Sequence, residues 1–365
     1  MGVRELYERT LAERGFHADP SQLRAIDALE RCELEWADYK ARRSNALTKL
    51  IAHPPIPRGV YLWGGVGRGK SFLMDCFFST LPLMRKTRLH FHEFMREVHR
   101  ELTEMTGTSD PLAHLGESIS RRFRLICLDE FHVADITDAM ILHRLLESLF
   151  ENRVSIVTTS NYPPDGLYPN GLHRERLLPA IELLEEKLEV VHVDGPVDYR
   201  QSTLQQVELY HTPLGPEADA AMNVAFERLA ETRDESPLLK IEHREIRARR
   251  RAGGVVWFDF RELCGGPRSQ NDYLELATQF HTLLLSGVPQ MSPRLASEAR
   301  RFTWLVDVLY DRRVKLIVSA AAAPEALYTE GPLVQEFPRT ASRLREMQSP
   351  EFLAEARRSV DTSLT

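Results

Sequence analysis

The stretch GVYLWGGVGRGKSFLMDCFF, from Gly59 to Phe78, decides the fold of this chain. It opens with a short apolar run, continues as a glycine-rich loop and closes with an apolar helical segment. The loop itself, Gly64 to Ser71, has the form G-x-x-x-x-G-K-S, a pattern that carries meaning only between a strand and a helix. Both neighbours are present. The sequence therefore predicts a phosphate-binding loop rather than a surface loop with an incidental lysine.

Each residue type in this loop suits a nucleotide. Gly64, Gly67 and Gly69 allow backbone N–H groups to turn inward toward an anion, and the following helix N-terminus adds its dipole. Lys70 supplies a compact positive charge for the β- and γ-phosphates, and Ser71 supplies a hydroxyl ligand for Mg²⁺. We therefore expect ATP and Mg²⁺ as ligands. The predicted nucleotide-binding residues are Gly64, Gly65, Val66, Gly67, Arg68, Gly69, Lys70, Ser71 and Phe72.

A second apolar run, Leu125 to Glu130 (LICLDE), ends in two carboxylates. A buried parallel strand has little use for adjacent acids at its carboxyl end unless a positive group lies there. We expect Asp129 to hold Mg²⁺ through water, together with Ser71, and Glu130 to polarise the attacking water as a general base. A solvated acid pair is the alternative, but the presence of Lys70 upstream favours ATP hydrolysis over simple nucleotide binding.

Two further polar positions complete the predicted site. Asn161 ends the run VTTSN, where it could hold the lytic water or touch the γ-phosphate beside Glu130, although it could also form a turn before Tyr-Pro-Pro. Arg174 and Arg176 stand at a helix start, where the helix dipole disfavours cations. This placement favours an arginine finger for a neighbouring subunit over surface ion pairs. The predicted catalytic residues are Lys70, Asp129, Glu130, Asn161 and Arg174.

Downstream of residue 59, apolar runs alternate with amphipathic stretches, as in a parallel sheet covered by helices. The predicted strands are Val60–Trp63, Leu89–Phe94, Leu125–Leu128, Ser155–Thr158 and Val190–Val193, and a helix is predicted over residues 20–50. The expected fold is thus α/β, a P-loop parallel sheet with flanking helices plus a C-terminal α/β lobe. We expect a helical segment at 1–58, an ATPase core at 59–195, a second α/β lobe at 196–330 and a helical segment at 331–365.

The second lobe contains a weak echo of the first. Residues 282–328 and 125–168 share a strand, a helix ending in an aromatic residue, a charged turn, a second strand and a closing Leu-Tyr. Trp257–Phe260 likewise echoes Phe91–Phe94, and residues 209–219 resemble a phosphate loop without its Gly-Lys-Ser. Leu285, Ser286 and Gly287 stand where Leu128, Asp129 and Glu130 stand. The alternatives are chance similarity and a catalytically inactive copy used for packing or partner binding.

Composition limits the remaining choices. The chain has 365 residues, 43% apolar and 27% charged, with a net charge of −6, so nucleic acid is an unlikely partner. Four scattered cysteines without C-x-x-C pairing predict buried, reduced thiols rather than a metal or disulfide framework. We find neither a signal peptide nor an apolar run of about 18 residues, and expect a cytoplasmic protein without a membrane-spanning segment. The basic stretch at 240–251 predicts a solvated hairpin, or alternatively a docking strip.

Five blocks together resemble the AFG-type ATPases, a family of AAA+ proteins: GVYLWGGVGRGKSFLMDCFF, RLHFHEFMREVH, LICLDEFHVADITDAMIL, TTSNYPPDGLYPNGLHRERLLPAI and FPRTASRLREM. The resemblance runs from about Gln22 to Phe352. It implies hydrolysis of ATP with Mg²⁺ coupled to conformational change, in a homo-oligomer. By this resemblance Gly64–Ser71 is Walker A, Asp129 and Glu130 are Walker B, Asn161 is sensor one and Arg174 is the finger. Arg339 and Arg343 could form a second sensor.

The resemblance also implies a partner. Bacterial members act at cell division, where they destabilise FtsZ polymers in an ATP-dependent way, and mitochondrial relatives serve quality control of inner-membrane proteins. The implied partner is therefore FtsZ or another protein client. A nucleotide-switched adaptor in quality control is the alternative, and a DNA-loading ATPase is disfavoured by the net acidity. The chain departs from the family pattern at His173, where glutamine is expected, and this departure leaves the phosphate site untouched.

Overall fold

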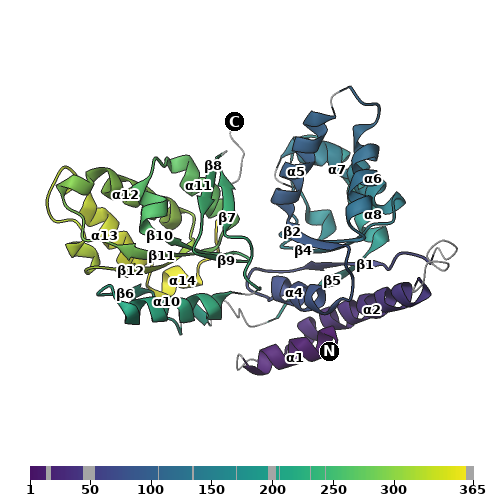
Figure 1. Cartoon of the computed structure of the whole chain (residues 1–365), viewed down its shortest axis with the longest axis horizontal. Coiled ribbons are helices and arrows are strands. Elements are labelled where there is room, and N and C mark those ends of the chain that lie inside the picture. The colour runs from purple at the N-terminus through teal and green to yellow at the C-terminus, as the bar shows by residue number, and fades with distance from the viewer. Residues whose placement is uncertain are drawn as a thin grey trace. The chain divides into compact units, whose positions relative to one another are not determined.

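The computed structural model describes residues 1–13, 18–43, 54–105, 107–133, 135–169, 171–195, 203–204, 206–230, 232–242 and 244–358. The chain divides into two units, Met1–Asp198 and Tyr199–Thr365, each built around its own sheet (Figure 1). The sequence predicts a division into four segments, which is finer than this division into two units, and it stays a prediction.

The first unit contains a five-stranded sheet in the order β2-β3-β4-β1-β5, and all of its strand pairs are parallel. Its strands are β1 (Gly59–Trp63), β2 (Lys86–His90), β3 (Leu125–Asp129), β4 (Ser155–Ser160) and β5 (Leu188–His192). Side chains alternate between two cores: Val60 and Leu62 of β1 face one, and Tyr61 faces the other. This architecture confirms the predicted α/β fold with a parallel sheet.

Helices cover both faces of this sheet (Figure 1). On one face lie α1 (Val3–Glu13), α2 (Pro20–Arg42) and α4 (Lys70–Thr80). On the other lie α5 (Phe91–Glu104), α6 (Pro111–Arg122), α7 (Ile136–Glu151) and α8 (Leu178–Lys187), with the short turns η1 (Pro164–Gly166) and η2 (Arg174–Arg176). The helix predicted over 20–50 begins at Pro20, where Asp19 caps it by accepting from two backbone N–H groups. Residues 44–50 lie outside the described part.

The strand predicted over Leu89–Phe94 is wrong from Phe91 onward. Strand β2 ends at His90, and Phe91 opens α5. The reason is a capping interaction, because the carboxylate of Glu93 accepts from the backbone N–H of His90 at 3.4 Å. Phe91 and Phe94 are then both buried at helical spacing. A short apolar run fits a strand and a helix equally well, and the cap decides between them.

The second unit is built on another five-stranded sheet, in the order β6-β12-β11-β10-β9, with β9 alone antiparallel to its neighbour. Its strands are β6 (Tyr210–His211), β9 (Arg250–Ala252), β10 (Val255–Asp259), β11 (Thr282–Val288) and β12 (Lys315–Ala320). Its helices and turns are α10 (Pro216–Leu229), η3 (Arg261–Gly265), α11 (Gln270–Gln279), η4 (Pro293–Leu295), α12 (Ala296–Asp311), η5 (Pro324–Ala326), α13 (Phe337–Glu346) and α14 (Pro350–Ala354). Strands β7 (Leu238–Ile241) and β8 (Arg244–Arg247) form the hairpin expected in the basic stretch.

The two units share an order of elements. In the first sheet β1 lies beside β4, then β3, then β2; in the second, β6 lies beside β12, then β11, then β10. Helices α7 and α12 each have 16 residues, and β4 and β12, which follow them, each have 6. The short turn η1 follows β4 as η5 follows β12. The correspondence predicted for Trp257 is shifted, because Phe260, not Trp257, follows its strand end as Phe91 does.

One left-handed position occurs in both units, directly after β3 in the first and inside β11, next to its last residue, in the second. Glu130 has a φ of 54° and Gly287 a φ of 75°, both in the left-handed region. The backbone N–H of Glu130 donates to the hydroxyl of Thr159 at 3.1 Å, and that of Gly287 donates to the hydroxyl of Ser319 at 3.1 Å. A left-handed residue with the same hydrogen bond to the neighbouring strand therefore occurs in both units.

All four cysteines are free and buried, as predicted. Within the described ranges, no helix is long and apolar enough to cross a membrane.

Candidate nucleotide site

The loop between β1 and α4 follows the backbone path that its glycines permit. Gly67 and Gly69 both have a φ of 77°, which residues with a side chain rarely adopt. At Gly64 a side chain would meet backbone, since a Cβ there would lie 2.0 Å from the carbonyl oxygen of Val193. The Gly64 N–H in turn donates to the carbonyl of Ser160 at 3.2 Å, which ties the loop to the end of β4.

Lys70 is the first residue of α4, and only 8% of it is exposed. Its ammonium group donates to the carbonyl oxygens of Gly64 and Gly65, each at 2.7 Å, and to Oδ1 of Asn161 at 3.1 Å. A phosphate oxygen is a stronger acceptor for this cation than a neutral carbonyl. The structure thus brings together two residues predicted to be catalytic, one from the loop and one from the end of β4.

The carboxyl end of β3 carries the two acids. Asp129 is its last residue and is 3% exposed. Its Oδ1 accepts from the hydroxyl of Thr159 at 3.1 Å, and the same hydroxyl accepts from the N–H of Glu130. Glu130 follows in the left-handed region, an uncommon conformation for a residue with a side chain. Thr159 therefore fixes the backbone and one carboxylate at the predicted catalytic turn.

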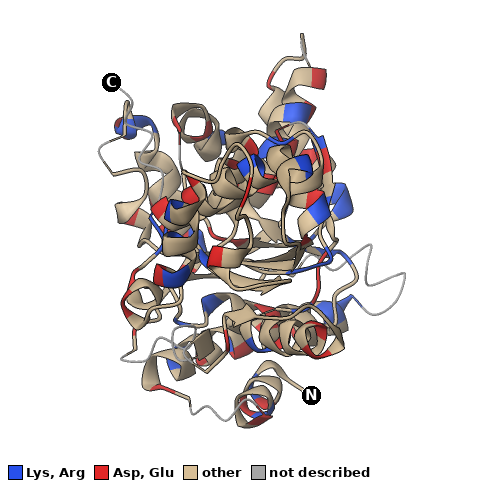
Figure 2. Cartoon of the chain, turned by 90° about the vertical axis from the view of Figure 1, so that its left-hand side faces the viewer, with Lys and Arg blue, Asp and Glu red and all other residues tan. Residues whose placement is uncertain are grey.

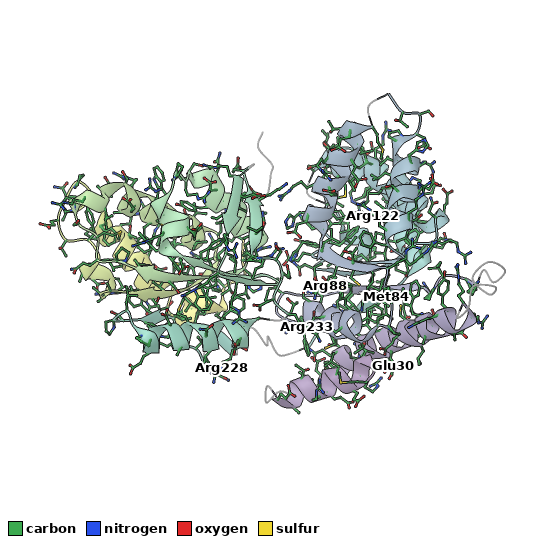
Figure 3. The ribbon with its side chains drawn as sticks, viewed as in Figure 1. Glu30, Met84, Arg88, Arg122, Arg228 and Arg233 are labelled. Carbon is green, nitrogen blue, oxygen red and sulfur yellow. The ribbon has the colours of Figure 1, made fainter. Side chains whose placement is uncertain are left out.

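Arg88, labelled in Figure 3, comes from the edge strand β2 and joins three elements. Its Nε and Nη2 donate to Oδ2 of Asp129 at 2.8 and 2.5 Å, and its Nη1 donates to Asp75 of α4 at 2.6 Å. Its Nη2 also reaches the backbone carbonyl of Ser71 at 3.4 Å. Sequence reasoning gave no role to Arg88 or Asp75, although both lie in blocks that carry the family resemblance, because the predicted strand began at Leu89 and neither residue belongs to the phosphate loop or the acid pair.

The donors present fit Mg²⁺. The guanidinium of Arg88 touches both the Asp129 carboxylate and the Ser71 backbone, so the predicted ligands on β3 and α4 lie near one another. A hydroxyl and a carboxylate are hard oxygen donors, and Mg²⁺ usually keeps several waters beside one or two such ligands. In the part of the chain described, no group of three His, Cys, Asp or Glu side chains could hold a metal, and a site of this kind needs none.

The first two helices support the loop from outside. Nε2 of Gln22 on α2 donates to the carbonyl of Arg68 at 3.0 Å, and its Oε1 accepts from the hydroxyl of Tyr7 on α1 at 2.7 Å. The Tyr7 ring lies 5.9 Å from that of Phe72. The Phe72 side chain is thus buried in this contact, and only its backbone N–H can face a phosphate. No sequence motif pointed to Tyr7 or Gln22 as parts of the site.

The predicted finger contacts its own unit. Arg174 donates to the carbonyls of Asp165 and Leu167, at 2.5 and 3.4 Å, and so lies against the turn η1, while Arg176 is exposed. In the second unit, Arg343 forms an ion pair with Asp307 of α12 at 2.5 Å. The finger role of Arg174 and the second-sensor role of Arg339 and Arg343 stay predictions.

The chain is similar to a protein family and to several known proteins. The AFG1-like ATPase family model matches residues 1–356. The chain is 43% identical over 360 residues to Cell division protein ZapE of Escherichia coli K12, covering 95% of this chain and 96% of that protein. It is 34% identical over 353 residues to Lactation elevated protein 1 homolog B of Danio rerio, covering 84% and 70%. Among solved structures, domain III of the Thermotoga maritima replication initiation protein DnaA matches with 19% identity and a TM-score of 0.36, covering 58% of this chain and 80% of that chain.

Proposed function

This chain belongs to the AFG1-like ATPase family and is an ATPase, and from that premise we propose that it hydrolyses ATP with Mg²⁺ to remodel a protein partner. One observation carries the proposal. The ends of β1 and β4 meet at Lys70, whose ammonium group is held by the loop carbonyls and by Asn161. This arrangement supports a phosphate site in which Asn161 can sense the terminal phosphate.

The residues divide the chemistry among them. The loop N–H groups and the N-terminus of α4 bind the phosphates, and Lys70 neutralises the charge on the β- and γ-oxygens. Ser71 and Asp129 are the groups that would hold Mg²⁺, which supplies positive charge for the phosphates when bound. Glu130 takes a proton from the attacking water, and Asn161 orients that water or the γ-phosphate. Asp129 ends β3, whereas Glu130 has a left-handed φ. The two carboxylates therefore do not share one strand conformation and can take different roles.

For the partner we propose a protein polymer at the division site, FtsZ, because a relative of 43% identity is a cell division protein. Lys and Arg are interspersed with Asp and Glu along the helices in Figure 2, which supports a protein partner over nucleic acid. Assembly into homo-oligomers, with Arg174 reaching a neighbour's nucleotide, belongs to the same proposal. A cytoplasmic location stays a prediction.

We also propose that the second unit is an inactive copy of the first. Its strand order and its left-handed turn at Gly287 support this proposal. The chemistry is missing, since the connection from β6 to α10 covers only residues 212–215 and contains no lysine. Ser286 and Gly287 occupy the places of the two acids. The unit would then serve packing or partner binding while the first unit binds the nucleotide.

The test compares ATP turnover and FtsZ polymer light scattering for the wild type and for Glu130→Gln, each with and without ATP. A remodelling ATPase predicts that the wild type lowers scattering only with ATP and that Glu130→Gln, which retains ATP, does not. A nucleotide-switched adaptor predicts that Glu130→Gln acts as well as the wild type. An unchanged polymer signal in all arms would exclude FtsZ as the partner without affecting the ATPase assignment.

A further inference from the structure

We propose that Arg88 is a positioning residue of the nucleotide site: it holds the buried carboxylate of Asp129 in place and yields that carboxylate to Mg²⁺ when nucleotide binds. This inference rests on the proposed Mg²⁺-dependent ATPase. Arg88 lies on an edge strand, outside the phosphate loop and the acid pair, and contacts Asp129 through two hydrogen bonds to the same oxygen, Oδ2.

The charges around Arg88 make this exchange favourable. The side chains of Asp129, Arg88 and Asp75 are only 4%, 12% and 17% exposed. Removing a carboxylate from water is costly unless a positive group and hydrogen bonds compensate it. Here one guanidinium bonds two carboxylates, so its positive charge is divided between Asp129 and Asp75. A divalent cation near Asp129 would supply positive charge to that carboxylate in place of Arg88, and Arg88 would keep its bond to Asp75.

The hydrogen bonds also define where competition occurs. Oδ1 of Asp129 is engaged by the hydroxyl of Thr159, a neutral donor that can stay in place. Oδ2 accepts both bonds from Arg88, and Nη2 of Arg88 also lies 3.4 Å from the carbonyl of Ser71. Arg88 thus bridges the two residues predicted to hold the metal. A cation bound between Ser71 and Asp129 would therefore compete with the guanidinium of Arg88 for Oδ2 of Asp129.

The second unit offers an internal comparison. Trp257 on β10 stands opposite Leu284 of β11, as Arg88 on β2 stands opposite Cys127 of β3. Nε1 of Trp257 donates to the hydroxyl of Ser286 at 2.7 Å, so the same diagonal contact exists with a neutral pair. Where the carboxylate is absent, the arginine is absent too. The contact between the two strands is made there by an indole N–H rather than by a cation, which ties Arg88 to the charge of Asp129.

The main experiment titrates Mg²⁺ against the full chain and a fixed concentration of a fluorescent ATP analogue, with anisotropy as the readout. We expect Arg88→Gln to lower the Mg²⁺ concentration at half-saturation about tenfold, because the cation no longer displaces a charge-assisted hydrogen bond. Turnover should fall at the same time, since Asp129 is held less firmly. Lys86→Gln is the matched control: Lys86 also leaves β2 to bond the carbonyl of Leu81, and its loss should not move the Mg²⁺ requirement.

A second readout needs no nucleotide. Arg88→Gln should lower the unfolding temperature, and adding Asp129→Asn should recover part of the loss, because no buried carboxylate then lacks its partner. Arg88→Lys, which keeps the charge but loses the planar fork, should lower the Mg²⁺ requirement by less than Arg88→Gln does.

Two results would overturn the inference. One is a Mg²⁺ requirement in Arg88→Gln that stays equal to that of the wild type or rises. The other is an additive effect of Arg88→Gln and Asp129→Asn on stability. A wild-type chain that binds no nucleotide at any Mg²⁺ concentration would instead contradict the proposed function, so the two failures can be told apart.

Discussion

At Lys70, three oxygen atoms surround one ammonium group, and two of them belong to the loop that leads into its own helix. The third belongs to Asn161 at the end of the neighbouring strand β4, so the ammonium group contacts both the loop and that strand end. Thr159 plays a comparable part for the acids, because a single hydroxyl orders Asp129 and Glu130. At the scale of residues, the site is held by short polar contacts between adjacent strand ends.

Replacing Glu130 with glutamine should separate binding from chemistry. The amide keeps the shape of the side chain but cannot accept the proton of the attacking water, so turnover should fall by about 100-fold or more. Affinity for ATP should stay the same or rise, because Glu130 is not part of the phosphate-binding loop. Steady-state phosphate release and equilibrium binding of an ATP analogue measure the two effects. Near-normal turnover in Glu130→Gln would remove this residue from the role of general base.

The cysteines should be unreactive in the folded chain. Burial raises the pKa of the Cys32 thiol to about 12 and raises that of Cys127, on β3, as well. Because the thiolate is the nucleophile, both groups stay protonated and inert at neutral pH. Iodoacetamide at pH 8 should label neither residue in the native protein and both in denaturant, as read by mass spectrometry of the peptides. Fast native labelling of Cys127 would contradict the burial of β3.

At the scale of elements, capping and register explain what sequence patterns could and could not predict. Strands β1, β3 and β4 follow from apolar runs that end at motif residues, so the sequence places Lys70, Asp129 and Asn161 at one sheet edge. The end of β2 depends on the cap that Glu93 provides to His90. The spacing of apolar residues does not predict this hydrogen bond. Arg88 was missed for another reason, because its contact with Asp129 appears only once β2 is paired with β3.

Gln22 should matter for nucleotide binding although α2 lies outside the motif. Its amide holds the carbonyl of Arg68, and Tyr7 holds the amide in place. Gln22→Ala removes one partly buried hydrogen bond from the loop and leaves the Tyr7 hydroxyl without this partner. We expect ATP affinity to fall by roughly fivefold to tenfold, while Tyr7→Phe, the milder change, should have a smaller effect. Isothermal titration calorimetry of both variants measures this difference. Equal affinity for wild type and Gln22→Ala would show that α2 does not stabilise the loop for nucleotide binding.

At the scale of the whole molecule, the two sheets have the same order of four strands. Only the first unit has the charged residues Lys70, Asp129 and Glu130 at the strand ends. The two units share a backbone conformation rather than charged side chains at corresponding positions, since the left-handed residue is Glu130 in one unit and Gly287 in the other. Likewise, the contact of Arg88 with Asp129 is replaced by that of Trp257 with Ser286. Differences of this kind are why the sequence shows only a weak echo, whereas the strand orders of the two sheets agree.

An inactive second unit predicts one nucleotide per chain. Calorimetric titration with a slowly hydrolysed ATP analogue and Mg²⁺ should give a stoichiometry near one, and Lys70→Ala should abolish binding altogether. A stoichiometry near two, or residual tight binding in Lys70→Ala, would show a second site and contradict the account of residues 212–215 as a connection without phosphate-binding capacity.

The most direct test of the central claim is the steady-state rate of ATP hydrolysis by the wild type and by Lys70→Ala, with Lys187→Ala as a control at an exposed lysine. The account predicts that Lys70→Ala lowers the rate by about 100-fold or more, because the developing phosphate charge loses its cation, and that Lys187→Ala changes nothing. A rate in Lys70→Ala equal to that of the wild type would contradict hydrolysis at the loop of residues 64–71.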